Sequence, residues 1–177
     1  MSDKLGLIES RKKIFSSFSR TEKKIIEKIC KYLILLIKEN RKLKDYNEII
    51  KSQESLIFNS KHYLCISLKD FLIFLEEFYE LEDYTIIGGI IFLERFCNDA
   101  SIILTEYNVY ILIFISFLLS IKTLEDFCYE NSYYSRIIGM NIKHFNKLEY
   151  KFITTIDYKL HINKSEYQRY KKYFDYI

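Results

Sequence analysis

Adjacent carboxylates are the first candidates for catalytic groups in this chain, because acid–base catalysis often uses paired acidic groups. There are three such pairs: Glu76-Glu77, Glu82-Asp83 and Glu125-Asp126. General acid–base catalysis needs two groups whose surroundings push their pKa values apart, and nothing around these pairs indicates that. His144 follows Lys143 on an expected helix surface, and no partner with a catalytic spacing accompanies it. We therefore assign no catalytic residue and do not expect an enzyme.

The cysteines and histidines are too scattered to predict a metal site. They lie far apart in the sequence, without a C-x-x-C or a close histidine pair: Cys30, Cys65, Cys97, Cys128, His62, His144 and His161. Metal sites and disulfide frameworks need patterned spacing. We therefore expect no metal, cofactor or disulfide, and interpret the cysteines as buried free thiols in a reducing compartment.

The N-terminus has no secretory signal pattern. The longest nearly uncharged apolar run, residues 109–121, has 13 residues, whereas a membrane span needs about 20. We expect an intracellular protein, in the nucleus, the cytoplasm or both, that has no membrane partner.

Two charged residues occupy positions where the surrounding pattern calls for apolar side chains. Lys122 follows the long apolar run directly, and Glu149 lies between Phe145 and Phe152 on or at the edge of an apolar stripe. Lys122 could favour a helix C-terminus by about 0.3–1 kcal/mol, bridged to one of the two carboxylates that follow it. A buried carboxylate is costly without a donor, so Glu149 needs one in this chain or on a partner. A Lys122–Glu149 pair at a surface edge would satisfy both and would lie beside an apolar groove.

Apolar residues at spacings of three and four predict helices along most of the chain. The first should begin near Arg20 or Thr21 and fade near Asn40, and residues 41–61 could support a second, short helix. Residues 109–121 are apolar nearly all round, so their helix should be buried on most sides. Gly139 should end a short helix that precedes the last long one. Helix starts are expected at these residues: Ser67 (in a capping box with Asp70), Asp83, Thr105, Asn131 or Ser132, Asn141 and Asn163.

Gly88 and Gly89 lie inside the helix that begins at Asp83, where each costs about 1 kcal/mol relative to alanine. We expect that the missing Cβ atoms compensate for this cost by letting a neighbouring helix approach closely. No segment shows sustained strand alternation, so we predict an all-α protein, with a single five-helix bundle around a central buried helix and helical extensions at both ends. The expected division is a basic N-terminal helical extension (1–61), the bundle (62–162) and a C-terminal helix (163–177).

Charge is distributed unevenly along the chain. Residues 1–61 carry 15 Lys/Arg and 8 Asp/Glu, residues 62–130 carry 3 and 12, and residues 131–177 carry 9 and 4. The basic ends either attract the acidic middle or form solvated faces. The formal net charge of +3 is too small to argue for nucleic acid by itself.

Much of the chain, about residues 64–162, resembles a cyclin box, and specifically that of the P-type or U-type cyclins. The family pattern runs approximately A-x-K-F-x-D-D, N-x-Y-Y-A-x-I-G-G-I-S, L-N-x-L-E-x-x-F-L and F-x-L-x-V. This chain has S-I-K-T-L-E-D (120–126), N-S-Y-Y-S-R-I-I-G-M-N (131–141), F-N-K-L-E-Y-K-F-I (145–153) and Y-K-L-H-I (158–162). Upstream, G-I-I-F-L-E-R-F (89–96), L-T-E-Y-N-V (104–109) and I-S-L (66–68) are similar to the family's A-Y-I-Y-L-D-R-F, L-T-S-x-N-V and I-S-I.

The resemblance implies a regulatory subunit that binds and activates a cyclin-dependent protein kinase. In cyclins, a lysine at the end of the third box helix and a glutamate in the fifth hold the kinase, and those positions are Lys122 and Glu149. Apolar side chains around the fifth helix pack on a mobile helix of the kinase N-lobe, and by position these are Ile153 and Tyr158. A rigid domain that binds only the active placement of that helix shifts the kinase population toward it, which requires no catalytic residue.

The chain departs from the family pattern at two places. Phe74 replaces an arginine, and Tyr110-Ile111 replaces a His-Arg pair, so the family's first-helix contacts are not assigned here. No substrate-docking patch of the M-R-A-I-L kind is present either.

Two alternatives stay open: a cyclin-fold module in transcription that contacts nucleic acid or general factors, and a helical interaction protein without a kinase. Only the basic N-terminal arm favours nucleic acid, which we do not expect as a partner. On its own the chain is expected to be monomeric.

Overall fold

The computed structural model describes residues 24–53, 57–59 and 66–176. Within these ranges the chain forms eight helices and no strand, so the predicted all-α class is confirmed. Five of the helices, α4 to α8, form the predicted bundle. The helices are α2 (Lys24–Asn40), α3 (Tyr46–Gln53), α4 (Leu68–Tyr79), α5 (Asp83–Asp99), α6 (Val109–Leu124), α7 (Asn131–Ile137), α8 (Ile142–Thr155) and α9 (Lys164–Tyr176).

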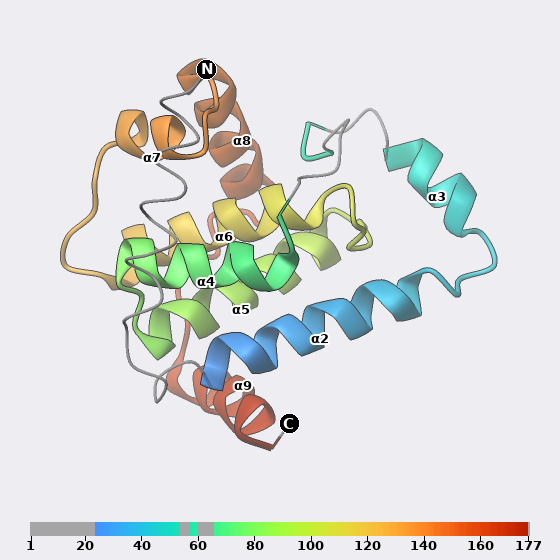
Figure 1. Ribbon diagram of the computed structural model, residues 1–177, viewed down its shortest axis with the longest axis horizontal. Coiled ribbons are helices and arrows are strands. Elements are labelled where there is room, and N and C mark those ends of the chain that lie inside the picture. Colours follow the sequence, from blue (N-terminus) through green and yellow to red (C-terminus); the bar gives the residue numbers. More distant parts are fainter. Residues whose placement is uncertain (1–23, 54–56, 60–65, 177) are drawn as a thin grey trace.

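The core is built around α6, as the apolar run predicted. Val109 and every residue from 112 to 121 are buried, including Ser116 and Ser120. Figure 1 shows α4, α5 and α6 running across the centre of the molecule, with α8 rising above them and α2 and α9 below. The short helix α3 projects to one side. α6 therefore ends among the other helices, and its C-terminal turn is placed against α8.

The glycine pair explains how closely α5 approaches α6. A Cβ atom at Gly88 would lie 2.5 Å from the Ser120 hydroxyl oxygen and 2.7 Å from the Leu124 side chain, and one at Gly89 would overlap the Phe117 ring. Contacts this short are not tolerated, so only glycine permits the approach. The predicted close packing is confirmed.

Most of the local helix signals also act as expected. Ser67 accepts a hydrogen bond from the Asp70 amide (3.1 Å), and its hydroxyl donates to the Asp70 carboxylate (2.7 Å). The side-chain oxygens of Asn141 and Asn163 accept from amides in the first turns of α8 and α9. Gly139, with φ of +68°, follows the end of α7. The end of α2 at Asn40 is confirmed, whereas its expected start near Thr21 lies outside the described residues.

One predicted helix start and one predicted cap were wrong. The helix expected from Thr105 begins at Val109 and has Asn108 as its N-cap residue. The reason is a buried turn in which the Asn108 side chain accepts from the Thr105 amide (2.8 Å) and donates to the Ile103 carbonyl (3.0 Å). In α7 the cap is Glu130 rather than Asn131 or Ser132.

The helices near the two ends of the chain pack on each other. Lys28 of α2 donates to the Phe174 carbonyl of α9 (2.6 Å), and the Tyr32 and Phe174 rings meet edge to face at 5.8 Å between centroids. α2 also packs against α4, and α9 against α5. The division of the chain at residues 61 and 162 stays a prediction.

The cysteines only partly follow the expectation of burial. Cys30 is buried, Cys97 is half-buried and Cys128 is exposed, all three as free thiols, while Cys65 lies outside the described residues. Burial raises the pKa of Cys97 to about 12. The expectation was wrong for Cys128 because that residue lies in the loop between α6 and α7.

Within the described ranges, no helix combines the length and the apolar character that crossing a membrane requires.

Candidate partner-binding site

The two charged residues that interrupt the apolar pattern meet where the end of α6 contacts α8. The Lys122 ammonium donates to the Glu149 carboxylate, and the two side chains are 26% and 12% exposed. The alternative bridge from Lys122 to Glu125 was wrong, because Glu125 instead accepts from the hydroxyls of Tyr84 (2.8 Å) and Thr85. The pair is therefore internal to the chain, but it lies at the surface.

Asn131 completes this site, although the sequence analysis had considered it only as a helix cap. Its side-chain oxygen accepts from the Lys122 ammonium (2.5 Å), and its amide nitrogen donates to Glu149 (2.6 Å) and to Asn146 (2.9 Å). We call Lys122, Asn131 and Glu149 the Lys122 cluster. The only sequence signal for Asn131 was its place in the N-x-Y-Y stretch of the family pattern.

The Lys122 cluster has unused hydrogen-bonding capacity. An ammonium carries three donors and a carboxylate has about four acceptor sites. Among the described residues, the Lys122 ammonium uses two donors, and Glu149 accepts one hydrogen bond on each oxygen. Since part of the Lys122 side chain is exposed, a partner that lies across this edge can still bind to the cluster.

The other two predicted site residues do not join the cluster. Ile153 lies one turn after Glu149 on the same face of α8 and packs, half-buried, against the core. Tyr158 lies beyond the end of α8 and is 62% exposed. The backbone there is left-handed, with φ of 51° at Asp157 and 54° at Tyr158. The structure thus joins Lys122 and Glu149, places Ile153 beside them, and sets Tyr158 apart.

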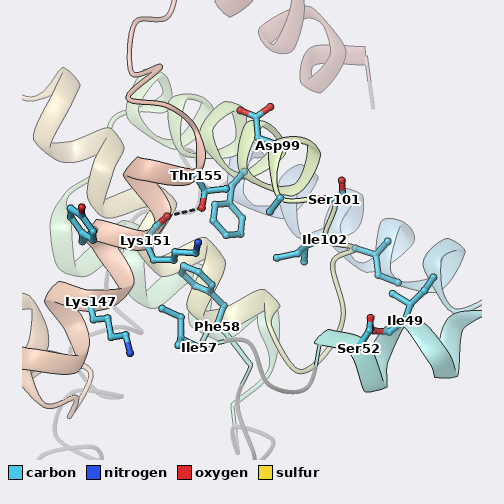
Figure 2. Close-up of a pocket in the computed structure, with 14 residues that line it drawn as sticks. Ile49, Ser52, Ile57, Phe58, Asp99, Ser101, Ile102, Lys147, Lys151 and Thr155 are labelled. Carbon is cyan, nitrogen blue, oxygen red and sulfur yellow. Dashed lines mark hydrogen bonds between the residues drawn. The ribbon is translucent and has the colours of Figure 1, made fainter.

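A cavity of about 940 Å³ opens between α3, the end of α5 with the loop that follows it, and α8. Figure 2 shows Ile49 and Ser52 on one side of it, Lys147 and Lys151 on the other, and Phe58 between them. None of the four predicted site residues lines it. Within the part of the chain that the structure describes, no three histidine, cysteine or acidic side chains converge on a possible metal position.

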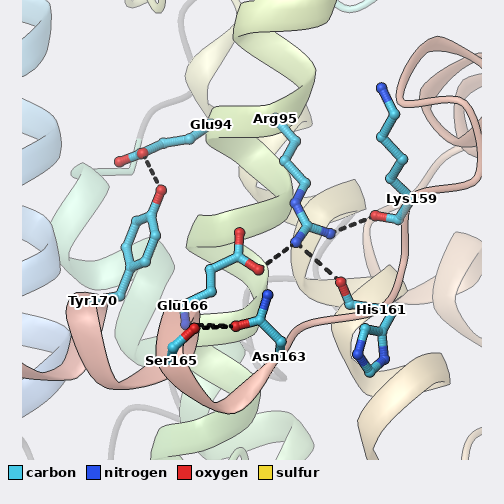
Figure 3. A network of polar contacts seen from close by, with 8 residues as sticks. All are labelled: Glu94, Arg95, Lys159, His161, Asn163, Ser165, Glu166 and Tyr170. Atoms are coloured by element: carbon cyan, nitrogen blue, oxygen red, sulfur yellow. Dashed lines mark hydrogen bonds and ion pairs between the residues drawn. The ribbon is translucent and has the colours of Figure 1, made fainter.

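The segment after Tyr158 is held by Arg95 of α5 (Figure 3). The Arg95 guanidinium donates to the carbonyls of Lys159 (2.5 Å) and His161 (3.0 Å) and to the Glu166 carboxylate of α9 (2.6 Å). We call these groups the Arg95 cluster. It fixes the path of the chain between α8 and α9, and hence the position of Tyr158. Arg95 lies in the L-E-R-F stretch of the sequence, and no role was predicted for it.

Glu94, the neighbour of Arg95, links three helices. Its carboxylate accepts hydrogen bonds from the Tyr32 hydroxyl of α2 and the Tyr170 hydroxyl of α9. Burial, and then the hydrogen bond to Glu94, raises the pKa of both tyrosines. α2 and α9 are therefore tied to α5 by polar contacts as well as by packing.

The residues that depart from the family pattern have structural contacts of their own. The Phe74 ring packs against that of Phe78, with 5.5 Å between centroids. Tyr110 packs against Phe71 at 5.2 Å, and its hydroxyl donates to the Ile66 carbonyl (2.9 Å). The contact of Tyr110 thus joins α6 to α4, whereas the contact of Phe74 lies within α4 itself.

Comparison with known proteins gives matches to one family. The family model described as Cyclin matches residues 12–160. Cyclin-U4-2 of Arabidopsis thaliana is 29% identical over 114 residues, which are 64% of this chain and 53% of that protein. Cyclin-P3-1 of Oryza sativa subsp. japonica is 25% identical over 147 residues, or 83% of this chain and 61% of that protein.

A third relative, PHO85 cyclin-6 of Saccharomyces cerevisiae, is 38% identical over 68 residues, or 38% of this chain and 16% of that protein. The chain thus spans about half the length of Cyclin-U4-2 and a smaller part of the yeast protein. The family match nevertheless covers most of the chain, so the chain belongs to the cyclin family, and its relatives place it with the U-type and P-type cyclins.

Proposed function

We propose that this cyclin binds and activates a cyclin-dependent protein kinase by positioning the mobile helix of the kinase N-lobe. The contact residues are Lys122, Glu149, Ile153 and Tyr158, and Asn131 orders the charged pair. The observation that carries the proposal is the Lys122 cluster, a partly exposed charged site whose donors and acceptors are not all used within the described chain.

The proposed contact follows from the chemistry of the cluster. The spare donor of the Lys122 ammonium can bind a backbone carbonyl at one end of a partner helix, and Glu149 can accept from a backbone amide. Ile153, one turn along α8, supplies an apolar contact beside the charges. Since Asn131 holds both charged groups, little side-chain entropy is lost when the partner binds.

Activation then needs only selective binding. A kinase is active when the glutamate of its mobile helix pairs with the lysine at the ATP site. A rigid domain with affinity for that placement alone raises its population. Cyclins are regulatory subunits, so the chemistry belongs to the kinase, and this chain would need no catalytic residue or cofactor. Such a partner would place the protein in the nucleus or the cytoplasm.

The test is a kinase assay with candidate cyclin-dependent kinases, each measured with and without this protein. Lys122→Ala and Glu149→Ala should each weaken kinase binding by about 2–5 kcal/mol, because truncation leaves the partner group unpaired. Lys42→Ala is the matched control, since it breaks an exposed Lys–Glu pair with Glu39 that is remote from the Lys122 cluster. Thermal unfolding by circular dichroism would check that each variant is folded.

Two results would count against the proposal in different ways. Normal kinase binding and activation by both alanine variants would reject the contact residues while leaving the kinase partner in place. If the unmodified protein neither bound nor activated any of the kinases tested, the function itself would be wrong. Salt-dependent binding to duplex DNA in that case would favour the transcription alternative.

A further inference from the structure

We infer that the cavity between α3, α5 and α8 is a docking site for a short acidic peptide segment that carries apolar side chains. This site goes beyond the proposed kinase contact. It is lined by other residues, and it would bind a segment of a substrate or regulator rather than the kinase helix.

The cavity has a buried aromatic floor. Phe58 and Phe96 are 3% and 1% exposed, and their rings meet edge to face with 4.8 Å between centroids. Phe96 in turn stacks on Phe152 of α8 at 4.4 Å. The half-buried side chains of Ile57 and Ile102 also line the cavity. An apolar side chain that enters would cover the exposed parts of these isoleucines, above a floor that is already held in place.

Two lysines give the cavity its charge preference. Lys147 and Lys151 are exposed on α8, and neither makes an ion pair within the described ranges. In Figure 2 the Lys151 side chain points toward the middle of the cavity, while Lys147 lies at its edge. Among the described residues of the lining, the one acidic side chain is Asp99, which already faces Lys159 at 3.5 Å. The free positive charge therefore favours a segment with carboxylates.

The spacing of the lysines fits an extended segment. Residues four apart on a helix are separated by about 6 Å along its axis. Side chains two apart on an extended chain are separated by about 6.6 Å and point the same way. Two acidic residues separated by one residue can thus reach Lys147 and Lys151 together. Tyr150, which also lines the cavity, is 67% exposed, so the cavity reaches the surface there.

The cavity and the Lys122 cluster lie on different sides of α8. Lys147 and Lys151 are each two positions from Glu149, which is about 200° around a helix of 3.6 residues per turn. A kinase bound at Glu149 and a peptide bound at the cavity would therefore not compete for the same face. This arrangement would let the cyclin bring an acidic segment close to a kinase.

The direct test is fluorescence anisotropy with the full chain and the fluorescein-labelled peptide Gly-Glu-Phe-Glu-Leu-Gly. The double variant Lys147→Glu/Lys151→Glu should bind about tenfold more weakly or worse, since each reversal removes an attraction and adds a repulsion. The matched control is Lys171→Glu/Lys172→Glu, which reverses two exposed charges on α9 and should change affinity less than about twofold. Equal weakening by both double variants would show non-specific attraction and overturn the proposal.

Two further peptides test the apolar part. Gly-Glu-Ser-Glu-Ser-Gly keeps the acidic residues and should bind about tenfold more weakly, because its side chains gain little from covering the half-buried isoleucines of the cavity. Gly-Lys-Phe-Lys-Leu-Gly should not bind. Equal binding of the serine peptide, or no binding of the first peptide up to a concentration of about 1 mM, would overturn the proposal. So would binding to phosphatidylserine vesicles that the cavity variant alone abolishes, because that result would assign the lysines to a membrane surface.

A kinase assay separates this inference from the proposed function. Lys147→Glu/Lys151→Glu should bind and activate the kinase normally, whereas Glu149→Ala should bind the peptide normally. If the lysine variant lost both activities while remaining folded, the cavity would belong to the kinase interface, and a separate docking site would be wrong. The peptide result stands even if no kinase partner is found.

Discussion

The Arg95 cluster and the Lys122 cluster are both cation–carboxylate contacts of similar exposure, but the chain surrounds them differently. Arg95 and Glu166 are each 19% exposed, and the guanidinium donates three hydrogen bonds that join α5 to the segment before α9 and to α9 itself. Lys122 and Glu149 are 26% and 12% exposed, and within the described residues the ammonium donates to two side chains, those of Asn131 and Glu149. The kind of acceptor, backbone carbonyls of a connecting segment in one case and side chains in the other, therefore separates a contact that fixes the path of the chain from the contact that we propose as a partner site.

The largest expected effect on stability is at Arg95. Arg95→Ala leaves two carbonyls and a half-buried carboxylate without their donor, so the free energy of unfolding should fall by about 3 kcal/mol. Lys122→Ala should lower it by only about 1 kcal/mol, because Asn131 still donates to Glu149 and water reaches the site. Urea unfolding measures both values. Equal losses at the two sites would show that the Arg95 cluster does not hold the fold more strongly than the Lys122 cluster does.

A smaller effect on kinase binding is expected at Asn131. Asn131→Ala removes the amide that holds Lys122 and Glu149, and kinase affinity should fall by about 1–2 kcal/mol. Asn146→Ala is the control, since Asn146 contacts the cluster only through Asn131 among the described residues. Isothermal titration calorimetry with the kinase would measure both variants. If Asn146→Ala were as harmful as Asn131→Ala, the amide would not be acting through the charged pair.

Tyr158→Gly should change the free energy of unfolding and the kinase affinity in opposite directions. The left-handed backbone of Tyr158 (φ 54°) costs a non-glycine residue energy, and its exposed ring contributes little packing. Glycine should therefore raise the free energy of unfolding by about 0.5 kcal/mol while weakening kinase binding by about 1 kcal/mol through loss of the ring. A stability gain with unchanged binding would remove Tyr158 from the contact residues.

The smallest effect is a pH dependence on the Glu94 side of the molecule. The pKa values of Tyr32 and Tyr170 are raised from 10.0 by burial and by the hydrogen bond to Glu94, so the fold favours the neutral phenols. The stability that they contribute is complete below pH 10 and is lost as pH rises above it, because the unfolded tyrosines then ionise. The loss should be roughly 0.3 kcal/mol per tyrosine near pH 10, allowing for the exposed part of Tyr170.

The measurement is urea unfolding at several pH values between about 8 and 11, because linkage makes the slope report proton uptake. The Tyr32→Phe/Tyr170→Phe variant should lose stability less steeply than the unmodified protein. Identical slopes would show that the two hydroxyls do not titrate differently in the folded and unfolded chains.

Hydrophobic periodicity and helix-capping residues were sufficient to predict the fold, but not the whole candidate site. Gly88 and Gly89 predicted a close helix contact, and the charges at Lys122 and Glu149 predicted an edge pair, because both features conflict with their local pattern. Asn131 was missed since an asparagine at a helix start already has a local explanation as a cap. Arg95 was missed because its acceptors are backbone carbonyls more than sixty residues away, which no side-chain pattern encodes.

The cavity could not be predicted from the sequence, for a related reason. Its lining combines Ile49, Phe58 and Phe96, which come from three separate segments and have no distinguishing pattern in the sequence. Only the tertiary arrangement brings them together beside Lys151.

The contact of Gly88 and Gly89 with α6 also has a kinetic consequence. Since Ser120 and Phe117 fill the places where Cβ atoms would be, α5 and α6 cannot rotate or slide past each other without collision. The separation between Arg95 on one helix and Lys122 on the other is therefore set before any partner arrives. A partner must adapt to a preformed template, so substitutions on this surface should change how long a complex lasts more than how fast it forms.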